Sequence, residues 1–250
     1  MSTKKIKLNC DIGESFGAWI MGNDEKIMPY IDQANIACGF HASDPLTMQK
    51  TVALAAKHNV EIGAHPSYPD LVGFGRRSIA CCKQELISLI QYQVGALIAI
   101  CQANGTTVQY VKPHGALYND MMKDNEIFET VCQAISQLDN RLSIMVQALP
   151  DMTAYLTIAN KYNLSMIEEG FADRAYQDSG LLVPRSQNNA VLTSSQSVVE
   201  RCQLLLEHGV FKSENDIALP LNVTSLCVHG DNTEAIQLVR KIRNYLDSKS

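Results

Sequence analysis

The sequence lacks several kinds of segment, and each absence excludes a class of protein. We expect no membrane-spanning helix, because no stretch of the 250 residues approaches the roughly 18 apolar residues that such a helix needs. No signal peptide is recognisable after Met1. The 21 Lys and Arg residues are outnumbered by 26 Asp and Glu residues and form no basic patch. We therefore expect neither a membrane nor nucleic acid as a partner.

The eight cysteines form no C-x-x-C pair. Six of them fall in apolar stretches of expected strands or helices, where a free thiol behaves as a small hydrophobic group. We therefore expect reduced thiols and a cytoplasmic protein. The sequence also has no G-x-x-x-x-G-K-S/T loop and no G-x-G-x-x-G at the start of a helix. Any nucleotide would have to bind without these phosphate-binding loops.

Short apolar segments alternate with longer amphipathic ones along the whole chain. The expected strands are residues 6–12, 32–37, 60–64, 108–111, 143–147, 164–167 and 225–228. The expected helices are residues 46–57, 83–102, 125–137, 151–161, 195–206 and 233–246. This alternation predicts an α/β fold with a parallel sheet, in one domain over residues 1–250. Seven or eight such units favour a closed or nearly closed barrel, with an open doubly wound sheet as the alternative.

Polar side chains collect where the expected strands end. Since the carboxyl ends of parallel strands form the active-site face of such folds, we expect these side chains to converge. Four of the six histidines belong to this set, whereas His58 and His208 precede Asn59 and Gly209 near helix ends and are expected to have capping roles. The candidate site residues are Asn9, Asp11, Glu14, His41, His65, Lys112, His114, Asp173, Arg174 and His229.

Asp11 has three possible roles at the end of a buried strand. It could be a general base, a ligand of a divalent metal, or one half of a buried salt bridge with Lys112. A metal would take Asp11, His41 and His65, a mixed nitrogen and oxygen set that suits zinc or manganese. The usual local spacings H-E-x-x-H and H-x-x-x-H are absent. The residues therefore leave a proton-transfer site and a metal site both open.

Two longer irregular stretches, residues 66–80 and 170–189, are expected to be binding loops or lids. The first contains Gly73-Phe74-Gly75-Arg76-Arg77. Its glycines permit close backbone approach, and Arg76 and Arg77 are suited to bind a carboxylate or a phosphate. A solvated arginine turn is the alternative interpretation.

Seven segments of the sequence resemble the LamB/YcsF family, which comprises the A subunits of 5-oxoprolinase. The resemblance covers essentially the whole chain, and each segment is long or polar enough to be specific. The segments are NCDIGESFG (9–17), NIACGFHASDP (35–45), GAHPSYPD (63–70), GFGRR (73–77), VKPHGALYN (111–119), FADR (171–174) and VHGD (228–231).

The resemblance implies a distorted seven-stranded β/α (TIM-like) barrel, related to the barrels of carbohydrate deacetylases. It implies the opening of 5-oxo-L-proline to L-glutamate, coupled to hydrolysis of ATP to ADP and phosphate. It also implies two partners, the B and C subunits of 5-oxoprolinase, either of which could hold the ATP. The deacetylases bind a metal through an H-x-x-x-H pair that this chain lacks, so the resemblance leaves a divalent metal open. A metal-dependent amide hydrolase or deacetylase acting alone, and a non-catalytic binding component, are the competing interpretations.

The lactam chemistry that the resemblance implies assigns roles to these residues. Asp11 would be the general base, and His41 and His65 would position water or phosphate. Lys112 and His114 would stabilise the oxyanion or protonate the amine. The substrate-binding candidates are Asn9, Glu14, Arg76, Arg77, Asp173, Arg174 and His229.

Overall fold

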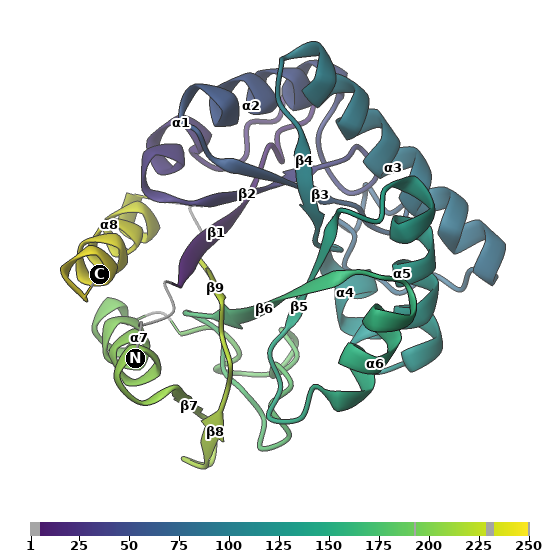
Figure 1. Cartoon of the computed structure of the whole chain (residues 1–250). Helices are drawn as coiled ribbons and strands as arrows, with labels where there is room; N and C mark the ends of the chain where they lie inside the picture. The colour runs from purple at the N-terminus through teal and green to yellow at the C-terminus, as the bar shows by residue number, and fades with distance from the viewer. Residues whose placement is uncertain (1–5, 193, 229–232, 250) are drawn as a thin grey trace.

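Seven parallel strands close into a barrel in the computed structural model, which describes residues 6–192, 194–228 and 233–249 (Figure 1). The ring closes because β1 pairs with β2 on one side and with β9 on the other, so that Asn9 lies opposite both Gln33 and Cys227. The barrel interpretation is therefore confirmed over the open sheet. In barrel order the strands are β1 (Lys7–Ile12), β2 (Gln33–Ala37), β3 (Glu61–His65), β4 (Val108–Val111), β5 (Ser143–Gln147), β6 (Ser165–Phe171) and β9 (Ser225–Cys227).

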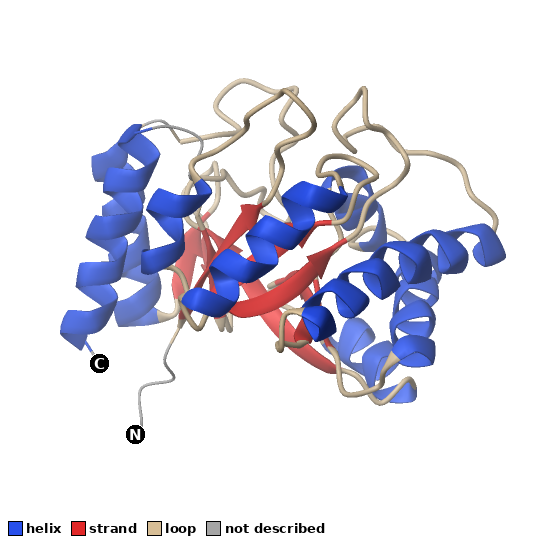
Figure 2. Cartoon of the chain, turned by 90° about the horizontal axis from the view of Figure 1, so that it is seen from above, coloured by secondary structure: helices blue, strands red, loops and turns tan. Residues whose placement is uncertain are grey.

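Helices surround this barrel on its outside (Figure 2). Local sequence explains where one of them, α2, starts and where another, α7, ends. The carboxylate of Asp44 accepts the backbone N–H groups of the first turn of α2, and Gly209 ends α7 with a φ of 68°. The helices are α1 (Asp24–Ile27), the 3-10 helix η1 (Met28–Tyr30), α2 (Pro45–Lys57), α3 (Lys83–Ala103), α4 (Gly115–Met121), α5 (Asn125–Leu138), α6 (Thr153–Lys161), α7 (Ser195–His208) and α8 (Thr233–Lys249).

The two histidines predicted to have capping roles do lie at helix ends. His58 is the residue that follows α2, and Asn59 after it has a φ of 55°. His208 is the last residue of α7, directly before Gly209. A cation or polar ring at a helix carboxyl end interacts favourably with the helix dipole, so neither residue needs a catalytic explanation.

The sequence did not predict the antiparallel hairpin of β7 (Val210–Lys212) and β8 (Ala218–Pro220), nor the short helices α1, η1 and α4. Each is seven residues or shorter, which is too little for a hydrophobic period to be recognised. The predicted sixth strand also ended at residue 167, whereas β6 continues to Phe171. This difference matters because the last residues of β6 enter the site.

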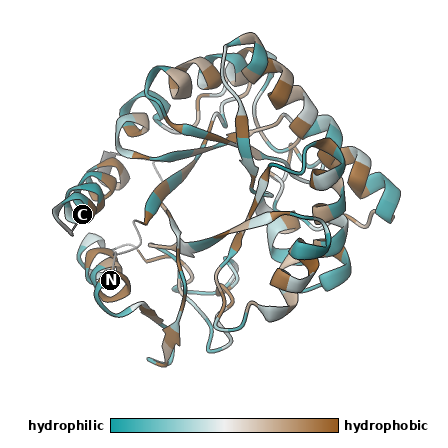
Figure 3. Cartoon of the chain, viewed as in Figure 1, coloured by the Kyte–Doolittle hydropathy of each residue, from teal (hydrophilic) through white to brown (hydrophobic). Residues whose placement is uncertain are grey.

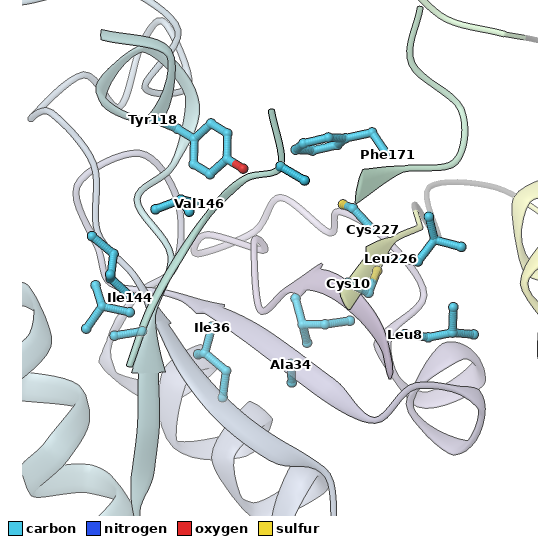
Figure 4. Close-up of a cluster of buried hydrophobic side chains, with 14 of the residues drawn as sticks. Leu8, Cys10, Ala34, Ile36, Tyr118, Ile144, Val146, Phe171, Leu226 and Cys227 are labelled. Atoms are coloured by element: carbon cyan, nitrogen blue, oxygen red, sulfur yellow. The ribbon is translucent and has the colours of Figure 1, made fainter. Parts of the chain in front are cut away.

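The apolar core lies mainly between the barrel and its helices. Figure 4 shows Leu8 and Cys10 of β1, Ala34 of β2 and Leu226 of β9 in the buried hydrophobic cluster. Along their strands these residues alternate with the inward-facing polar side chains, so they face the helices outside the barrel. Outside the barrel, the helices are amphipathic, with hydrophobic and hydrophilic residues mixed along each ribbon (Figure 3). Burial of these apolar faces, at about 25 cal/mol per Å², supplies the main stabilisation of the barrel.

Helix α3 corrects one expectation from composition. By length and composition it could cross a membrane, so the expectation that no stretch approaches such a span is wrong for this helix. In the structure it buries Leu86, Ile90, Val94 and Leu97, which share one face, and it packs along α5. A core helix of a folded domain passes the same length and composition test.

Candidate active site

A cavity of about 470 Å³ lies at the carboxyl ends of the barrel strands. Both irregular stretches contribute to its wall, the first through Phe74 and the second through residues 181–186. The convergence predicted from the sequence therefore occurs for most of the candidate residues. Those that line the cavity are Asp11, Glu14, His65, Arg76, Lys112, His114, Asp173 and Arg174.

Lys112 lies between two carboxylates at the floor of this cavity. Its Nζ is 2.9 Å from Oδ1 of Asp11 and 2.7 Å from Oε1 of Glu169. The Tyr118 hydroxyl donates to the other oxygen of Glu169 at 2.7 Å. Lys112 is 3% exposed and Glu169 is fully buried, so their charges are shielded from water. The salt bridge left open for Asp11 exists, and it belongs to a three-residue network.

The network keeps Lys112 positively charged. Burial by itself would lower the pKa of this ammonium group, but the charges of Asp11 and Glu169 outweigh it and hold the pKa well above its ordinary value. A lysine that does not lose its proton is a poor nucleophile or base. Its chemical use is as a fixed cation that stabilises negative charge developing beside it.

Asn9 lies beneath the cavity and does not line it. It is fully buried, and its amide accepts from Asn35 at 2.8 Å and donates to Ser225 at 2.7 Å. Asn35 in turn donates to Asp11 at 2.8 Å and accepts from the Tyr110 hydroxyl at 2.6 Å. This polar layer holds the Asp11 carboxylate in position from below. The substrate-binding role predicted for Asn9 stays a prediction, and its observed contacts are with protein groups.

Three of the four histidines predicted for the site, His41, His65 and His114, meet on the same face. The rings of His41 and His114 stack, with centroids 3.7 Å apart, and Nδ1 of His114 lies 2.9 Å from Nε2 of His65. Glu14 faces this group, with Oε1 3.5 Å from Nε2 of His41 and 3.9 Å from Nδ1 of His114. Burial, together with the neighbouring His65, holds the pKa values of His41 and His114 well below the ordinary value.

Arg76 and Arg77 point in different directions. The Arg76 guanidinium lies over the Phe74 ring, 5.1 Å from its centroid, and lines the cavity. Arg77 instead pairs with the buried Asp70, its Nε 3.0 Å from Oδ1, and is not among the cavity-lining residues. The structure therefore favours Arg76 over Arg77 as a group that can contact a bound anion.

Asp173 and Arg174 both line the cavity on the loop after β6. Arg174 donates to the backbone carbonyls of Ala190 and Val183, at 3.1 and 2.7 Å, and so ties this loop together. Burial lowers its pKa to about 10, which leaves it a cation at neutral pH. His229, the last substrate-binding candidate, lies outside the residues that the structure describes.

Sequence reasoning missed Glu169, Tyr118 and Arg185 as members of the site. Tyr118 and Arg185 line the cavity, and Glu169 binds Lys112 from behind. The signal that could have found Glu169 was its place in the acidic pair at the end of the sixth strand. Tyr118 lies within the same segment as Lys112 and His114, but one helical turn later, on α4.

Residues 13–17 match the G-x-S-x-G pattern of a serine-hydrolase elbow, and the structure does not support that role. Ser15 lies partly buried in a loop, where its hydroxyl donates to the Met21 carbonyl at 3.3 Å and accepts the Met21 N–H at 3.0 Å. The elbow would require the serine at a sharp turn directly into a helix, but α1 begins only at Asp24. Ser15 is therefore a loop residue in this fold.

The carboxylate of Asp24 provides a test of electrostatics beside the site. Its Oδ2 accepts the Gly13 N–H at 3.0 Å, and burial, with a smaller contribution from Glu14, raises its pKa from 3.8 to about 6. The folded protein then holds this proton more tightly than the unfolded chain, so stability should fall as pH rises from 3.8 to about 6. Asp24→Asn should raise the free energy of unfolding at pH 7 by about 2 kcal/mol.

Urea denaturation at pH 4 and pH 7 measures this effect. The wild type should lose stability between the two pH values relative to Asp24→Asn, because asparagine keeps the acceptor for Gly13 and carries no charge. Asp139→Asn, in a pair with the exposed Arg141, is the matched control and should show no gain. Equal unfolding free energies for wild type and Asp24→Asn at pH 7 would contradict the prediction.

Comparisons with known proteins agree with this architecture. Residues 6–250 match the model of the LamB/YcsF family. The A subunit of 5-oxoprolinase from Vibrio cholerae serotype O1 is 51% identical over 99% of this chain and 100% of its own length. A 5-oxoprolinase A subunit of Pseudomonas aeruginosa, the one numbered 3 in that organism, is 49% identical, with 98% of each chain covered.

A solved structure shares both the fold and a substantial part of the sequence. The crystal structure of a lactam utilization protein from Thermus thermophilus has a TM-score of 0.89 and 37% identity, over 98% of this chain and 97% of the other. The family match extends through every segment that carried the sequence resemblance. The chain therefore belongs to the LamB/YcsF family.

Proposed function

We propose that this chain is the A subunit of an ATP-dependent 5-oxoprolinase, which opens 5-oxo-L-proline to L-glutamate while ATP is hydrolysed to ADP and phosphate. The observation that carries the proposal is the 51% identity to a full-length 5-oxoprolinase A subunit, combined with a polar cavity lined by charged residues of the matching segments. A cavity of about 470 Å³ falls within the size range of small-molecule sites, and a five-membered lactam fills only part of it.

The chemistry of the substrate explains why ATP is needed. A five-membered lactam is a stable amide and therefore a poor electrophile. Transfer of the γ-phosphoryl group of ATP to the lactam carbonyl oxygen would convert that oxygen into a leaving group. Water then attacks the activated carbon, and the C–N bond breaks as the ring nitrogen takes a proton, which leaves an acyl phosphate. A second water hydrolyses this acyl phosphate to the carboxylate of L-glutamate and free phosphate. The site must supply a base for the water and stabilisation for the oxyanion.

Asp11 is the proposed base. Its carboxylate faces the cavity with 18% of its side chain exposed, whereas Glu169 on the other side of Lys112 is fully buried. Lys112 is the proposed cation that stabilises negative charge on the carbonyl oxygen, a role that suits an ammonium group with a raised pKa. His65 and His114 line the same wall and are proposed to orient the water or the phosphate.

The substrate carboxylate and the phosphoryl group need cations at the cavity wall. Arg76, Arg174 and Arg185 all line it, and a guanidinium binds such anions in bidentate fashion. Because Arg174 already donates to two backbone carbonyls, Arg76 and Arg185 are the proposed anion ligands. Glu14 and Asp173 lie at the same wall and are proposed to orient the substrate N–H.

The proposed enzyme works with two partners, the B and C subunits, one of which would hold the ATP. The lack of a standard phosphate-binding loop in this sequence supports a partner as the nucleotide site. We also propose a cytoplasmic location, since all eight cysteines lie in the described part of the chain and are free thiols.

Reconstitution tests the proposal. The purified chain is mixed with candidate B and C subunits, 5-oxo-L-proline and ATP, and glutamate and phosphate are quantified. We expect both products in equal amounts from the full complex, and little from this chain alone. Omitting ATP tests the competing activity, since a metal-dependent amide hydrolase would form glutamate without it. A verified three-component complex that forms no glutamate would refute the proposal.

A further inference from the structure

We propose that His41, His65, His114 and Glu14 form a binding site for one divalent transition-metal ion of the zinc type. One ligand atom from each residue lies within 4.8 Å of all the others. Three imidazoles and a carboxylate are a ligand set that zinc, cobalt and manganese accept. The proposal concerns metal binding by this chain alone and does not depend on the substrate proposed above.

The hydrogen bond of His65 sets which of its nitrogens can bind a cation. Its Nδ1 lies 2.6 Å from the backbone carbonyl oxygen of Lys112. A carbonyl oxygen only accepts hydrogen bonds, so Nδ1 must carry the proton. In the neutral ring Nε2 then presents a lone pair, and this atom points into the cluster. Histidines that ligate metals typically donate their other N–H to such a carbonyl.

His114 repeats this arrangement with its two nitrogens exchanged. Its Nε2 lies 2.9 Å from the Phe74 carbonyl oxygen and must therefore donate, which leaves a lone pair on Nδ1. This Nδ1 is 2.9 Å from Nε2 of His65. Two lone pairs that face each other at this distance repel unless a cation lies close to both. Both rings are thus oriented by backbone carbonyls to present nitrogens to one point.

The unsatisfied side chain of His41 is an independent observation that points to a bound ligand. Its side chain is completely buried, yet neither ring nitrogen makes a hydrogen bond to any of the residues that the structure describes. A buried imidazole without a partner costs about 1–3 kcal/mol, so such groups usually have one. Its Nε2 lies 3.5 Å from Glu14 Oε1 and belongs to the set of converging ligand atoms. A bound ion would satisfy it.

This site differs from the metal set expected from the sequence, which joined Asp11 to His41 and His65. Asp11 is instead bound to Lys112, and its Oδ2 is 3.4 Å from Nε2 of His65. Glu14 and His114 take its place in the converging group. The sequence could not show this, because Glu14 and His114 lie on loops that only the closed barrel brings together.

The proposed ion would face the substrate cavity, since Glu14, His65 and His114 all line its wall. A metal ion bound there would act as a Lewis acid toward a carbonyl or phosphoryl oxygen. The chain's own contribution is to hold four ligands and to orient two of the imidazoles through the Phe74 and Lys112 carbonyls. A proton shared by His65 and His114 is the competing explanation for their close approach.

Calorimetric titration of the purified chain tests the proposal. The chain carries no polyhistidine tag, is freed of metal with a chelator and is titrated with ZnCl₂ or CoCl₂. We expect about one equivalent to bind, with a rise in melting temperature that scales with metal concentration. The cobalt form should show the visible absorption of a nitrogen- and oxygen-ligated ion. None of these measurements requires turnover or partner proteins.

Matched variants assign the ligands. Glu14→Gln, His65→Gln and His114→Gln should each weaken zinc binding roughly 10-fold to 100-fold or more. His58→Gln and His208→Gln, the two histidines at helix ends, should bind zinc as the wild type does. The Glu14→Gln variant should fold normally, because this side chain is partly exposed and lies on a loop. A loss of zinc binding in this variant therefore reflects the lost ligand and not misfolding. Circular dichroism of every variant checks that it is folded.

Two results would overturn the proposal. The first is a folded wild-type chain that binds no more zinc or cobalt than the same chain with His41, His65 and His114 all replaced by glutamine. That result would leave the shared proton as the explanation for the contact of His65 and His114. The second is tight binding of one equivalent that the Glu14→Gln, His65→Gln and His114→Gln variants all retain. The ion would then bind elsewhere on the chain.

Discussion

Replacing Lys112 with methionine should destabilise the fold by about 3–5 kcal/mol, because it leaves the fully buried Glu169 without its cation. Methionine matches the length of the lysine stem, so the loss reflects charge more than packing. The same change should abolish turnover of the reconstituted complex, since the proposed stabilisation of the oxyanion disappears with the ammonium group. Urea denaturation and product assays measure the two effects separately.

A second substitution separates the structural role of Lys112 from its chemical one. In the double variant Lys112→Met with Glu169→Gln no buried carboxylate is left unpaired, and the glutamine oxygen can still accept from Tyr118. We expect this variant to recover most of the lost stability and none of the lost activity. If the single variant is as stable as the wild type, Lys112 and Glu169 are not the buried ion pair described above.

Replacing Asp11 with asparagine should lower the turnover rate roughly 100-fold to 10,000-fold while the fold stays intact. Asparagine keeps an oxygen that can accept from Lys112 and Asn35, so the network beneath it changes little. It cannot take a proton from water, which is the role proposed for the carboxylate. Because Lys112 retains Glu169 as a partner, no buried charge is stranded and we expect a melting temperature close to that of the wild type.

Steady-state kinetics of the reconstituted complex measures this effect. Asp139→Asn, at a partly buried aspartate that is paired with Arg141 outside the cavity, is the matched control and should leave the rate unchanged. A near wild-type rate in Asp11→Asn would remove Asp11 as the base and transfer the role to another group of the cavity. A rate loss that is confined to KM would instead indicate a binding role.

The fold could be predicted in good part because its central strands are buried on both faces. The barrel strands are short segments in which apolar residues alternate with mostly buried polar ones, and β2 is buried at all five of its positions. The number of units favoured a closed barrel, but the pairing of β1 with β9 that closes the ring could not be read from local sequence, since their residues are more than 200 positions apart. Local periodicity contains no information on such long-range hydrogen bonds.

The candidate site, like the fold, could be predicted from the sequence only in part. The ends of parallel strands share one edge, so the meeting of Asp11, His65 and Lys112 followed from their positions alone. The direction in which each side chain points did not follow from these positions. Arg77 turns to Asp70, and Asn9 lies under the cavity instead of in its wall. Such outcomes depend on neighbours that are remote in sequence.

The sequence by itself determined the alternation of strands and helices, the gathering of polar residues at one edge and the resemblance to the LamB/YcsF family, because all three are patterns of residue type along the chain. Only the tertiary structure decided that β1 pairs with β9 to close the barrel, that Glu169 completes the charges around Lys112, and that Glu14 and His114 face His41 and His65. The physical reason is that charge pairing and ligand geometry depend on distances of a few ångströms between atoms that only the folded chain brings together.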